Sequence, residues 1–379
     1  MDTPFPYSQH VTGKHFVGRK KDVTLLGNLI AQGEHVVIYE PPKTGKTSLV
    51  QQTLLDMKMS GKNFVVGQMS ALDIRTVQDF VLRYGSTVLK MAGGNPGEYA
   101  ALVQEYLDGT HFVFDVEAYS ERGEVLSLSW EMDQEDIQAA LSLPARISAK
   151  KDIMLVLILD NFQCVTLMDN PDNLLLPLSK VLKENRRGRF TAIIMGNGVN
   201  AMKSMFYRNI RFHRVVERVA LSPIDEKELA DHIAQGFRVS GKVIQPADLF
   251  LGASRLFKAH PWYTNNFAAI CDHLSKGYIP EPVLVDALAC IISLHEQRFK
   301  DTLDSLTTHQ VNLLKAALDG ETRFASADII RKYDLHSSAN VKRIKDALMK
   351  KEVLVFDDED NPSFEDPLFE YWLRQLLRG

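Results

Sequence analysis

The sequence predicts an α/β protein with a parallel sheet, followed by a helical region and then by short helices and strands. Three uninterrupted apolar runs support the first part of this prediction, at residues 36–39, 153–159 and 192–195. An apolar run without alternation indicates a strand buried on both faces, as in a parallel sheet that helices cover. Helical spacing dominates residues 222–300, and the pattern changes again from about residue 306.

The residues after the first apolar run have the pattern of a phosphate-binding P-loop. A strand is followed by a tight turn and then by Gly-Lys-Thr-Ser, which opens a helix. Backbone N–H groups at a helix start have no intrahelical partner and bind phosphate. Gly45 allows close approach of the backbone, Lys46 reaches the terminal phosphates, and the Thr47 hydroxyl ligates magnesium. The loop residues expected to hold a nucleotide are Lys43, Thr44, Gly45, Lys46, Thr47 and Ser48.

The loop departs from the usual pattern at its first position. A glycine normally stands five residues before Gly45, where this chain has Glu40. A carboxylate facing a triphosphate would be repelled, so Glu40 must point away or be neutralised if a nucleotide binds. Pro41 and Pro42 have no N–H groups, which leaves the amides from Lys43 onward to hold phosphate.

Composition limits the possible classes of protein. The chain has 379 residues, 45% of them hydrophobic, and a net charge of −4, which gives no sign of a generally nucleic-acid-binding surface. No apolar run approaches the roughly 20 residues that a membrane span needs, and the N-terminus does not have the pattern of a signal peptide. Cys164, Cys271 and Cys290 are expected to be reduced core residues of a cytoplasmic protein.

Several further elements are expected between and after the strands. Residues 74–91 and 133–150 have helical spacing, and residues 111–130 predict a hairpin with its turn at 120–123. Ser222 is expected to be the N-cap of the first helix of the helical region, since Pro223 follows it.

The second apolar run ends in Asp160, which places a carboxylate at the carboxyl end of a buried strand. In P-loop proteins such a carboxylate holds magnesium, so we expect Thr47 and Asp160 to be the metal ligands. A P-loop together with a strand that ends in an acid is much more specific than either feature alone. The two features predict binding of a nucleotide with Mg²⁺, and the family resemblance described next implies that this nucleotide is ATP or ADP.

Motifs at both ends of the chain resemble one family. The segment Phe16-Val17-Gly18-Arg19 precedes a helix, a strand and a P-loop, and residues 366–374 read Asp-Pro-Leu-Phe-Glu-Tyr-Trp-Leu-Arg. Both resemble the AAA+-related STAND ATPases, and more narrowly the archaeal-type ATPase group that is also found in bacteria. The resemblance implies that residues 16–19 lie against the adenine.

The helical region carries a further motif of that family. Ala-His-Pro-Trp-Tyr at residues 259–263 is similar to the family's Gly-His-Pro-Tyr-Tyr, with alanine in place of glycine. In STAND proteins this proline-containing turn belongs to a helical lid that closes on the nucleotide. The resemblance therefore implies nucleotide contacts for His260 and Pro261.

The family's catalytic glutamate is missing. Members of the family have Asp-Glu-Phe-Gln where this chain has Asp-Asn-Phe-Gln at residues 160–163. The glutamate is the usual base for the attacking water, and the amide of Asn161 cannot accept a proton near neutral pH. We therefore expect slow or absent hydrolysis, unless another carboxylate serves as the base.

The resemblance also implies two residues that sense the terminal phosphate. AAA+ proteins place a polar sensor at the end of the strand that here finishes with Asn197. The family carries an arginine in an aromatic context farther on, and Arg214 is the best match, with Arg208 second. An arginine suits this task because it is planar, always charged and multidentate.

The end of the chain has the outline of a winged helix-turn-helix. Helices are expected at 307–318, 325–333 and 337–350, followed by β-rich residues on either side of an acidic tip at 357–360. The third helix carries basic residues, yet the acidic tip would repel phosphates, and residues 305–379 have a net charge of −2. A structural or regulatory winged helix is favoured over a DNA reader.

The predicted architecture is a P-loop domain at residues 1–221, a helical lid at 222–303 and a winged helix at 304–379. The predicted function is that of a cytoplasmic ATP-binding switch with an unidentified protein partner, in which the nucleotide controls the position of the lid and the winged helix. The alternatives are an active Mg-dependent ATPase, a DNA-binding regulator, and a scaffold that binds no nucleotide. The scaffold would have Glu40 turned into the phosphate site.

Overall fold

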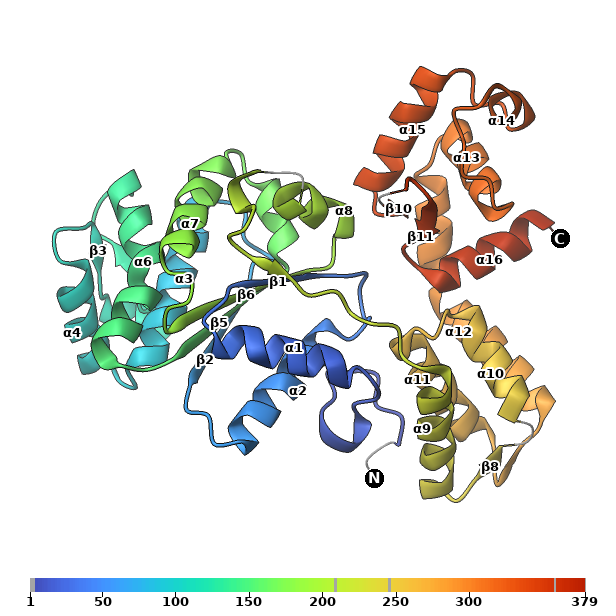
Figure 1. The fold of residues 1–379 in the computed structure, drawn as a ribbon, viewed down its shortest axis with the longest axis horizontal. Helices are drawn as coiled ribbons and strands as arrows, with labels where there is room; N and C mark the ends of the chain where they lie inside the picture. Colours follow the sequence, from blue (N-terminus) through green and yellow to red (C-terminus); the bar gives the residue numbers. More distant parts are fainter. Residues whose placement is uncertain (1–3, 208–209, 245–246, 358, 379) are drawn as a thin grey trace. The chain divides into compact units, whose positions relative to one another are not determined.

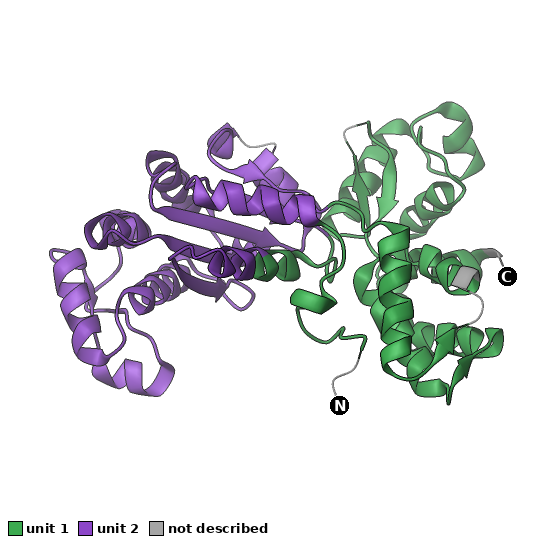
Figure 2. Ribbon diagram, turned by 60° about the horizontal axis from the view of Figure 1, so that its bottom comes forward, with its two compact units in different colours: residues 1–19, 41–52, 222–379 green, residues 20–40, 53–221 purple. Residues whose placement is uncertain are grey.

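The computed structural model of the chain describes residues 4–207, 210–244, 247–357 and 359–378 (Figure 1). The chain forms two compact units, which Figure 2 shows in different colours. The sheet unit comprises Lys20–Glu40 and Thr53–Leu221, and the helical unit comprises Met1–Arg19, Pro41–Gln52 and Ser222–Gly379. The units interleave in the sequence, and the division into three domains stays a prediction.

The sheet unit is built on five parallel strands in the order β2-β5-β6-β1-β7. Every residue of β1 and β6 is buried, which accounts for the apolar runs in the sequence. Because all the strands are parallel, the residues that follow β1, β5 and β6 emerge at the same edge. The strand bounds are Val36–Tyr39 for β1, Val65–Ser70 for β2, Leu155–Asp160 for β5, Phe190–Gly196 for β6 and Glu217–Arg218 for β7.

Helices cover both faces of this sheet (Figure 1). The first, α1, packs against the second half of α2, since a Cβ on Gly27 would lie 3.5 Å from the Thr53 methyl carbon. The opposite layer contains α3, α6 and α7. The bounds are Lys20–Ala31 for α1, Lys46–Met59 for α2, Val77–Ala92 for α3, Gln134–Lys151 for α6 and Asp172–Glu184 for α7. Short helical segments follow at Phe162–Leu167, Val199–Met202, Lys203–Tyr207 and Ile210–Phe212.

The predicted hairpin at residues 111–130 is only partly correct. Strands β3 (Phe112–Val113) and β4 (Ser127–Leu128) pair antiparallel, after helix α4 (Pro96–Leu107). The expected turn is wrong, because helix α5 (Val116–Arg122) occupies it. Asp115 caps this helix by accepting hydrogen bonds from two backbone N–H groups.

The first part of the helical unit after the sheet unit, residues 222–304, contains four long helices and one small parallel strand pair among its described residues. The first helix begins later than expected, because Asp225 and not Ser222 is its N-cap. Phe5 is fully buried in the core of this unit, with its ring 4.7 Å from that of Phe237. The bounds are Glu226–Val239 for α9, Ala247–Leu256 for α10, Pro261–Leu274 for α11, Glu281–Asp304 for α12, Val243–Ile244 for β8 and Tyr278–Ile279 for β9; a short turn, η1, spans Gly13–His15.

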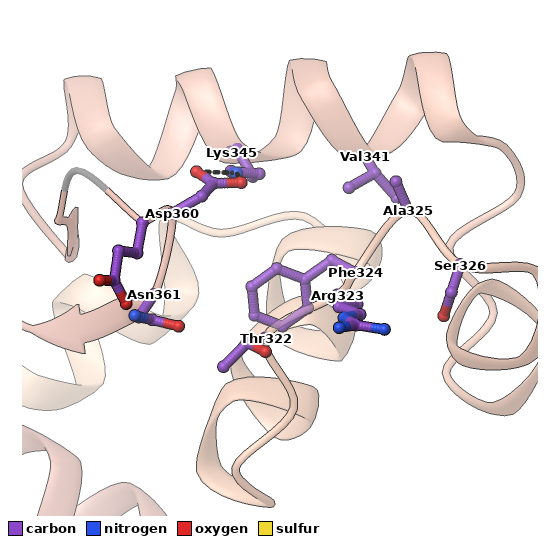
Figure 3. Close-up of a pocket in the computed structure, with 10 residues that line it drawn as sticks. Thr322, Arg323, Phe324, Ala325, Ser326, Val341, Lys345, Asp360 and Asn361 are labelled. Carbon is purple, nitrogen blue, oxygen red and sulfur yellow. Dashed lines mark hydrogen bonds and ion pairs between the residues drawn. The ribbon is translucent and has the colours of Figure 1, made fainter.

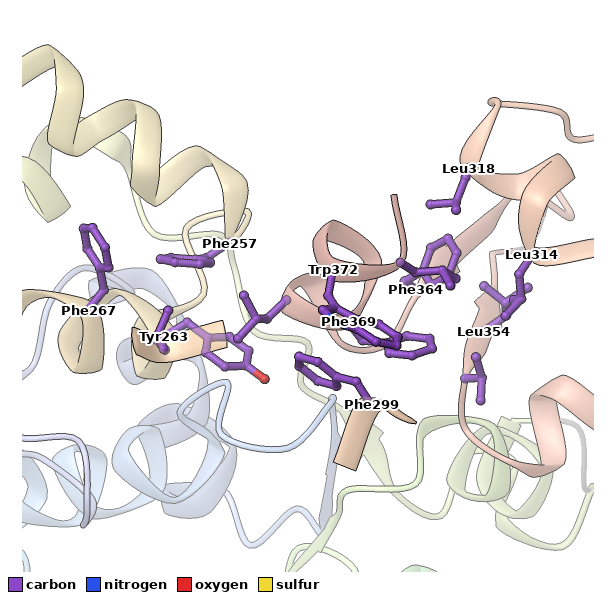
Figure 4. Close-up of a cluster of buried hydrophobic side chains, with 14 of the residues drawn as sticks. Phe257, Tyr263, Phe267, Phe299, Leu314, Leu318, Leu354, Phe364, Phe369 and Trp372 are labelled. Atoms are coloured by element: carbon purple, nitrogen blue, oxygen red, sulfur yellow. The ribbon is translucent and has the colours of Figure 1, made fainter. Parts of the chain in front are cut away.

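The winged helix-turn-helix outline is confirmed. Three helices precede an antiparallel strand pair and a last helix. One continuous hydrophobic core joins this part to the lid helices, and Phe299 of α12 lies 5.6 Å from both Phe369 and Trp372 of α16 (Figure 4). The bounds are Thr308–Leu318 for α13, Ala327–Lys332 for α14, Ser338–Lys350 for α15, Leu354–Phe356 for β10, Pro362–Phe364 for β11 and Pro367–Arg378 for α16.

The three cysteines are free, as expected, but they are not all core residues. Cys164 and Cys271 are buried, whereas Cys290 lies on an exposed face of α12. Within the described ranges, no helix has both the length and the apolar character that a membrane crossing requires.

Candidate nucleotide-binding site

The P-loop of the helical unit has the backbone geometry that a phosphate site requires. Lys43 and Gly45 both have positive φ angles, of 62° and 101°, and α2 begins directly afterwards at Lys46. A side chain at position 45 would meet Arg19, whose Nη1 lies 2.8 Å from the place of a Cβ. Glycine is therefore needed at position 45 both for the turn and for the close approach.

Lys46 is a buried cation at the start of α2. Its side chain is 5% exposed, and its Nζ donates a hydrogen bond of 2.8 Å to the Pro41 carbonyl oxygen. The Thr44 hydroxyl donates to the same carbonyl at 2.9 Å. These bonds keep the ammonium group within the loop, where the positive end of the helix dipole also favours anions.

The predicted segment at residues 16–19 holds the loop from the N-terminal side. The Arg19 guanidinium donates to the Thr44 carbonyl at 2.6 Å and to the Ser222 carbonyl at 2.8 Å. A Cβ on Gly18 would lie 3.0 Å from a carboxylate oxygen of Glu228, so this glycine packs directly on α9. Phe16 and Val17 are half-buried. Arg19 therefore connects the loop to the start of the lid.

The N-terminal residues also form hydrogen bonds with side chains of helix α2. The Val11 N–H donates to the Ser48 hydroxyl at 3.1 Å, and the Gly13 N–H donates to the Gln52 side chain at 2.7 Å. Next to this segment lies a hollow of about 230 Å³. Its lining includes Pro4, Lys14, His15, His232, Gln235 and Val239.

The lid contacts the loop through α11. His260 is the N-cap residue of this helix, Pro261 is its first residue, and the His260 Nε2 atom lies 3.2 Å from the Pro42 carbonyl oxygen. Burial lowers the pKa of His260 to about 4, so the ring is neutral near pH 7. A neutral ring that donates from Nε2 fits this geometry. The structure thus places His260 against the P-loop backbone, and its contact with a nucleotide stays a prediction.

Three amide and hydroxyl side chains form a network at the carboxyl edge of the sheet. The Asn161 amide donates to the Ser70 hydroxyl at 3.0 Å, and its oxygen accepts from the Asn197 amide at 2.9 Å. Asp160 accepts from the Asn161 N–H at 2.8 Å, and Gln163 accepts from the Asn197 N–H at 3.1 Å. The structure therefore brings three predicted residues together, namely Asp160, Asn161 and Asn197.

Sequence reasoning missed Ser70, which stands at the end of strand β2. Ser70 is the register partner of Asp160. A polar residue at the carboxyl end of a neighbouring parallel strand was the signal that could have identified it.

Glu40 is neutralised within the sheet unit. Its carboxylate lies 2.6 Å from Arg218 Nη2 and accepts a 3.3 Å hydrogen bond from the Leu221 N–H. The same guanidinium donates to the Tyr39 carbonyl at 2.7 Å, and its Cζ atom lies 3.7 Å from the centre of the Tyr39 ring. Arg218, in β7, is the counterion that the sequence reasoning required but did not name.

Arg214 is not joined to the other predicted catalytic side chains. It is exposed, has a φ angle of 58°, and its carbonyl accepts a 2.6 Å hydrogen bond from Arg186. Among the described residues, no ion pair holds its guanidinium. The second candidate, Arg208, lies outside the described residues.

The winged helix has a pocket of its own, of about 420 Å³ (Figure 3). It lies between the residues before α14, the helix α15 and the strand-connecting wing. Lys345 of α15 forms an ion pair with Asp360 of the wing. This pair neutralises one of the basic residues of the third helix, on which DNA binding would depend.

Comparison with known proteins supports the architecture. Residues 297–375 match a family described as a probable winged helix domain. Among solved structures, a Walker-type ATPase of Pyrococcus abyssi superimposes with a TM-score of 0.66 and 15% identity, covering 98% of this chain and 99% of that chain. The chain has the fold of a Walker-type ATPase.

The ORC2 protein of Aeropyrum pernix, solved as ADPNP–ADP complexes, has the same fold with a TM-score of 0.56. Its identity is 12%, and the match covers 99% of this chain and 98% of that chain. Comparison with curated proteins gives no match. At this level of identity the structural matches establish the fold, and they confirm the predicted parallel-sheet P-loop architecture with its C-terminal winged helix.

Proposed function

We propose that this protein is an ATP-binding switch with weak or absent hydrolysis. The observation that carries the proposal is the P-loop itself, in which a buried Lys46 and a left-handed Gly45 stand at the start of α2. Arg19 and His260 hold this loop from two sides. Such a loop binds polyphosphate through its N–H groups and through the lysine.

The proposed ligand is a magnesium nucleotide. Thr47 and Asp160 offer hydroxyl and carboxylate oxygens, which are the ligands that Mg²⁺ prefers. The bound ion would neutralise charge on the phosphates. Lys46 would hold the terminal phosphates, and the Asn197 amide would contact them from the strand end. Because Arg218 neutralises Glu40, that carboxylate is no obstacle to a triphosphate.

The base is proposed to lie beside the N-terminal segment. The resemblance of residues 16–19 supports adenine, and the hollow between His15 and α9 offers space next to that segment. The ORC2 protein with the same fold was solved with ADPNP and ADP. ATP and ADP are therefore the nucleotides to test first.

Slow hydrolysis is proposed because Asn161 offers no base. Its amide is engaged with Ser70 and Asn197, and an amide cannot take a proton from water near neutral pH. The alternative of an active ATPase requires another carboxylate in the same position relative to the water. The carboxylate in the network around Asn161 is that of Asp160, which we assign to magnesium.

The lid offers a route from the loop to the winged helix. The Tyr263 hydroxyl, on the same helix as His260, donates to Asp366 at 2.8 Å. Arg298 of α12 donates to the same carboxylate at 2.7 Å. We propose that nucleotide-dependent closure of the lid repositions the winged helix for an unidentified protein partner in the cytoplasm. Nucleotide can move this equilibrium only by the difference in its affinity for the two states.

The test is titration calorimetry with Mg-ATP on wild type, Lys46→Ala and Lys58→Ala. Lys58 lies exposed in the last turn of the same helix and serves as the matched control. We expect Lys46→Ala to weaken binding by about 10- to 100-fold, from the loss of charged hydrogen bonds. Lys58→Ala should bind like wild type. A wild type that binds no nucleotide, or a Lys46→Ala variant that binds equally well, would refute the proposal.

The competing proposal is a DNA-binding regulator that acts through the winged helix. Its signature would be an affinity for duplex DNA that falls steeply with salt concentration. The Lys345–Asp360 pair argues against it.

A further inference from the structure

The P-loop carries a second cation with an unusual partner. The ammonium of Lys43 lies 3.5 Å from the centre of the Trp262 ring, in cation–π contact. Among the described residues, no carboxylate forms an ion pair with Lys43. Partial burial, and next the charge of Arg298, lower the pKa of Lys43, while Asp366 opposes this shift. The loop therefore holds a cation whose partner is an aromatic ring.

Trp262 is held firmly by its neighbours in the lid. It follows His260 and Pro261 at the start of α11 and is half-buried. Its ring lies 5.4 Å from that of His295 on α12 and 6.0 Å, edge to face, from that of Tyr7. A contact between Lys43 and Trp262 therefore fixes the loop to two helices of the lid.

The next residue extends this connection to the winged helix. Tyr263, whose ring lies 5.0 Å from that of Trp262, donates its hydroxyl to Asp366 at the start of α16. Arg298 donates to the same carboxylate. A change at Trp262 is thus one residue away from the contact that joins the lid to the winged helix.

The Lys43 ammonium cannot contact the Trp262 ring and a phosphate at the same time. A cation–π contact contributes about 0.5–2 kcal/mol, depending on desolvation. An ion pair with a terminal phosphate has a full negative charge on the partner and is stronger in such a setting.

We propose that Lys43 is the residue by which the loop reports a nucleoside triphosphate to the lid. Its ammonium lies either on Trp262 or on the terminal phosphate, and binding of the triphosphate releases Trp262. A diphosphate, which lacks that phosphate, leaves the contact in place. This inference rests on the proposed function, since it assigns the residue that distinguishes ATP from ADP.

The free energy of the Lys43–Trp262 contact limits how far its loss can shift the lid equilibrium. A lost contact of this strength shifts the lid equilibrium by a factor of about 2 to 30. The switch is therefore graded: when the triphosphate is bound, release of Trp262 frees α11 for the lid movement proposed above.

The first test uses tryptophan fluorescence in a Trp130→Phe background. This background removes an exposed tryptophan of the sheet unit and leaves Trp262 and the buried Trp372. Saturating Mg-ADPNP should change the emission, and Mg-ADP should change it much less. Adding Trp262→Phe should abolish the ADPNP response, and adding Lys43→Met should abolish it while leaving Trp262 in place.

The second test measures affinity by calorimetry. Trp262→Phe weakens the cation–π contact that competes with the phosphate for Lys43, so ADPNP should bind about 2- to 5-fold more tightly. The affinity for ADP should not change. Lys43→Met should weaken ADPNP binding by about 10-fold and ADP binding by much less. Lys58→Met, far along α2, is the control and should change neither.

The outcomes separate the two proposals. A wild type that binds neither nucleotide refutes the proposed function, and this inference with it. Tight binding of both nucleotides, with equal fluorescence responses that survive Lys43→Met, refutes this inference alone.

Discussion

Asn161 is the residue on which the proposed absence of hydrolysis rests. The sequence already indicated that it replaces a glutamate, and the structure adds that its amide is engaged on both sides, by Ser70 and Asn197. The residue has a φ angle of 53°, a conformation that asparagine tolerates better than most residues. An amide in this position can orient a water molecule but cannot deprotonate it.

Restoring the carboxylate should restore hydrolysis. We expect Asn161→Glu to raise the rate of phosphate release by about 100-fold or more, the usual contribution of a general base. Asn161→Gln has the same length without the base and is the matched control, which should stay as slow as wild type. Single-turnover phosphate release measures both variants. Equal rates for Glu and Gln would show that residue 161 does not limit the chemistry.

Sequence reasoning could not identify which residue neutralises Glu40. The requirement for a counterion followed from the position of the carboxylate, but Arg218 lies 178 residues away in the chain. Only the pairing of β1 with β7 brings the two side chains together. Pairs of this kind depend on tertiary structure and leave no local pattern.

At the scale of elements, continuous apolar runs predicted the buried strands well. Sequence reasoning was weaker at element ends, where capping chemistry offers several candidates. Asp225 caps α9 in place of Ser222, since its carboxylate accepts from the N–H groups of Lys227 and Glu228. The hairpin at residues 111–130 was wrong at its turn, because Asp115 starts a helix there.

The residue before strand β1, His35, should make the stability of the sheet unit depend on pH. His35 is fully buried, and its Nδ1 accepts a 3.1 Å hydrogen bond from the Ala192 N–H of β6. Burial lowers the pKa of His35 to about 4, from an ordinary value near 6.5. The unfolded chain thus takes up a proton in this range before the folded one does.

Stability of the sheet unit should therefore fall as the pH drops from about 6.5 to 4. The contribution of His35 to this loss is at most about 3 kcal/mol. Urea unfolding at pH 7.5 and 5, followed by circular dichroism, measures the effect. In His35→Gln the difference between the two pH values should shrink, whereas His10→Gln, at an exposed position, should behave like wild type. An unchanged difference in His35→Gln would contradict this assignment.

At the scale of the whole molecule, the motifs at residues 259–263 and 366–374 were recognisable in the sequence, but their connection was not. The structure joins them through the Tyr263–Asp366 hydrogen bond and through one core that runs from the lid into the winged helix. It also groups the P-loop residues 41–52 with the lid. Long-range packing of this kind cannot be read from periodicity or spacing.

This arrangement is the physical basis of the proposed switch. The nucleotide loop contacts α11 through His260 and Trp262, and α11 contacts the winged helix through Tyr263. A ligand in the loop can therefore bias the lid and the winged helix together. In the proposed switch, the pairing of Asp360 with Lys345 in the acidic wing argues against DNA as the target of that movement.

The most direct test of the account is to load wild-type protein with Mg-ATP, remove free nucleotide, and follow the identity of the bound nucleotide over time. We expect stoichiometric binding, with bound ATP that persists and a turnover far below about one per second, an ordinary enzymatic rate. Turnover at or above that rate would show an active ATPase, and Asn161 would have been misinterpreted. Protein that retains no nucleotide would contradict the central claim that this P-loop binds ATP.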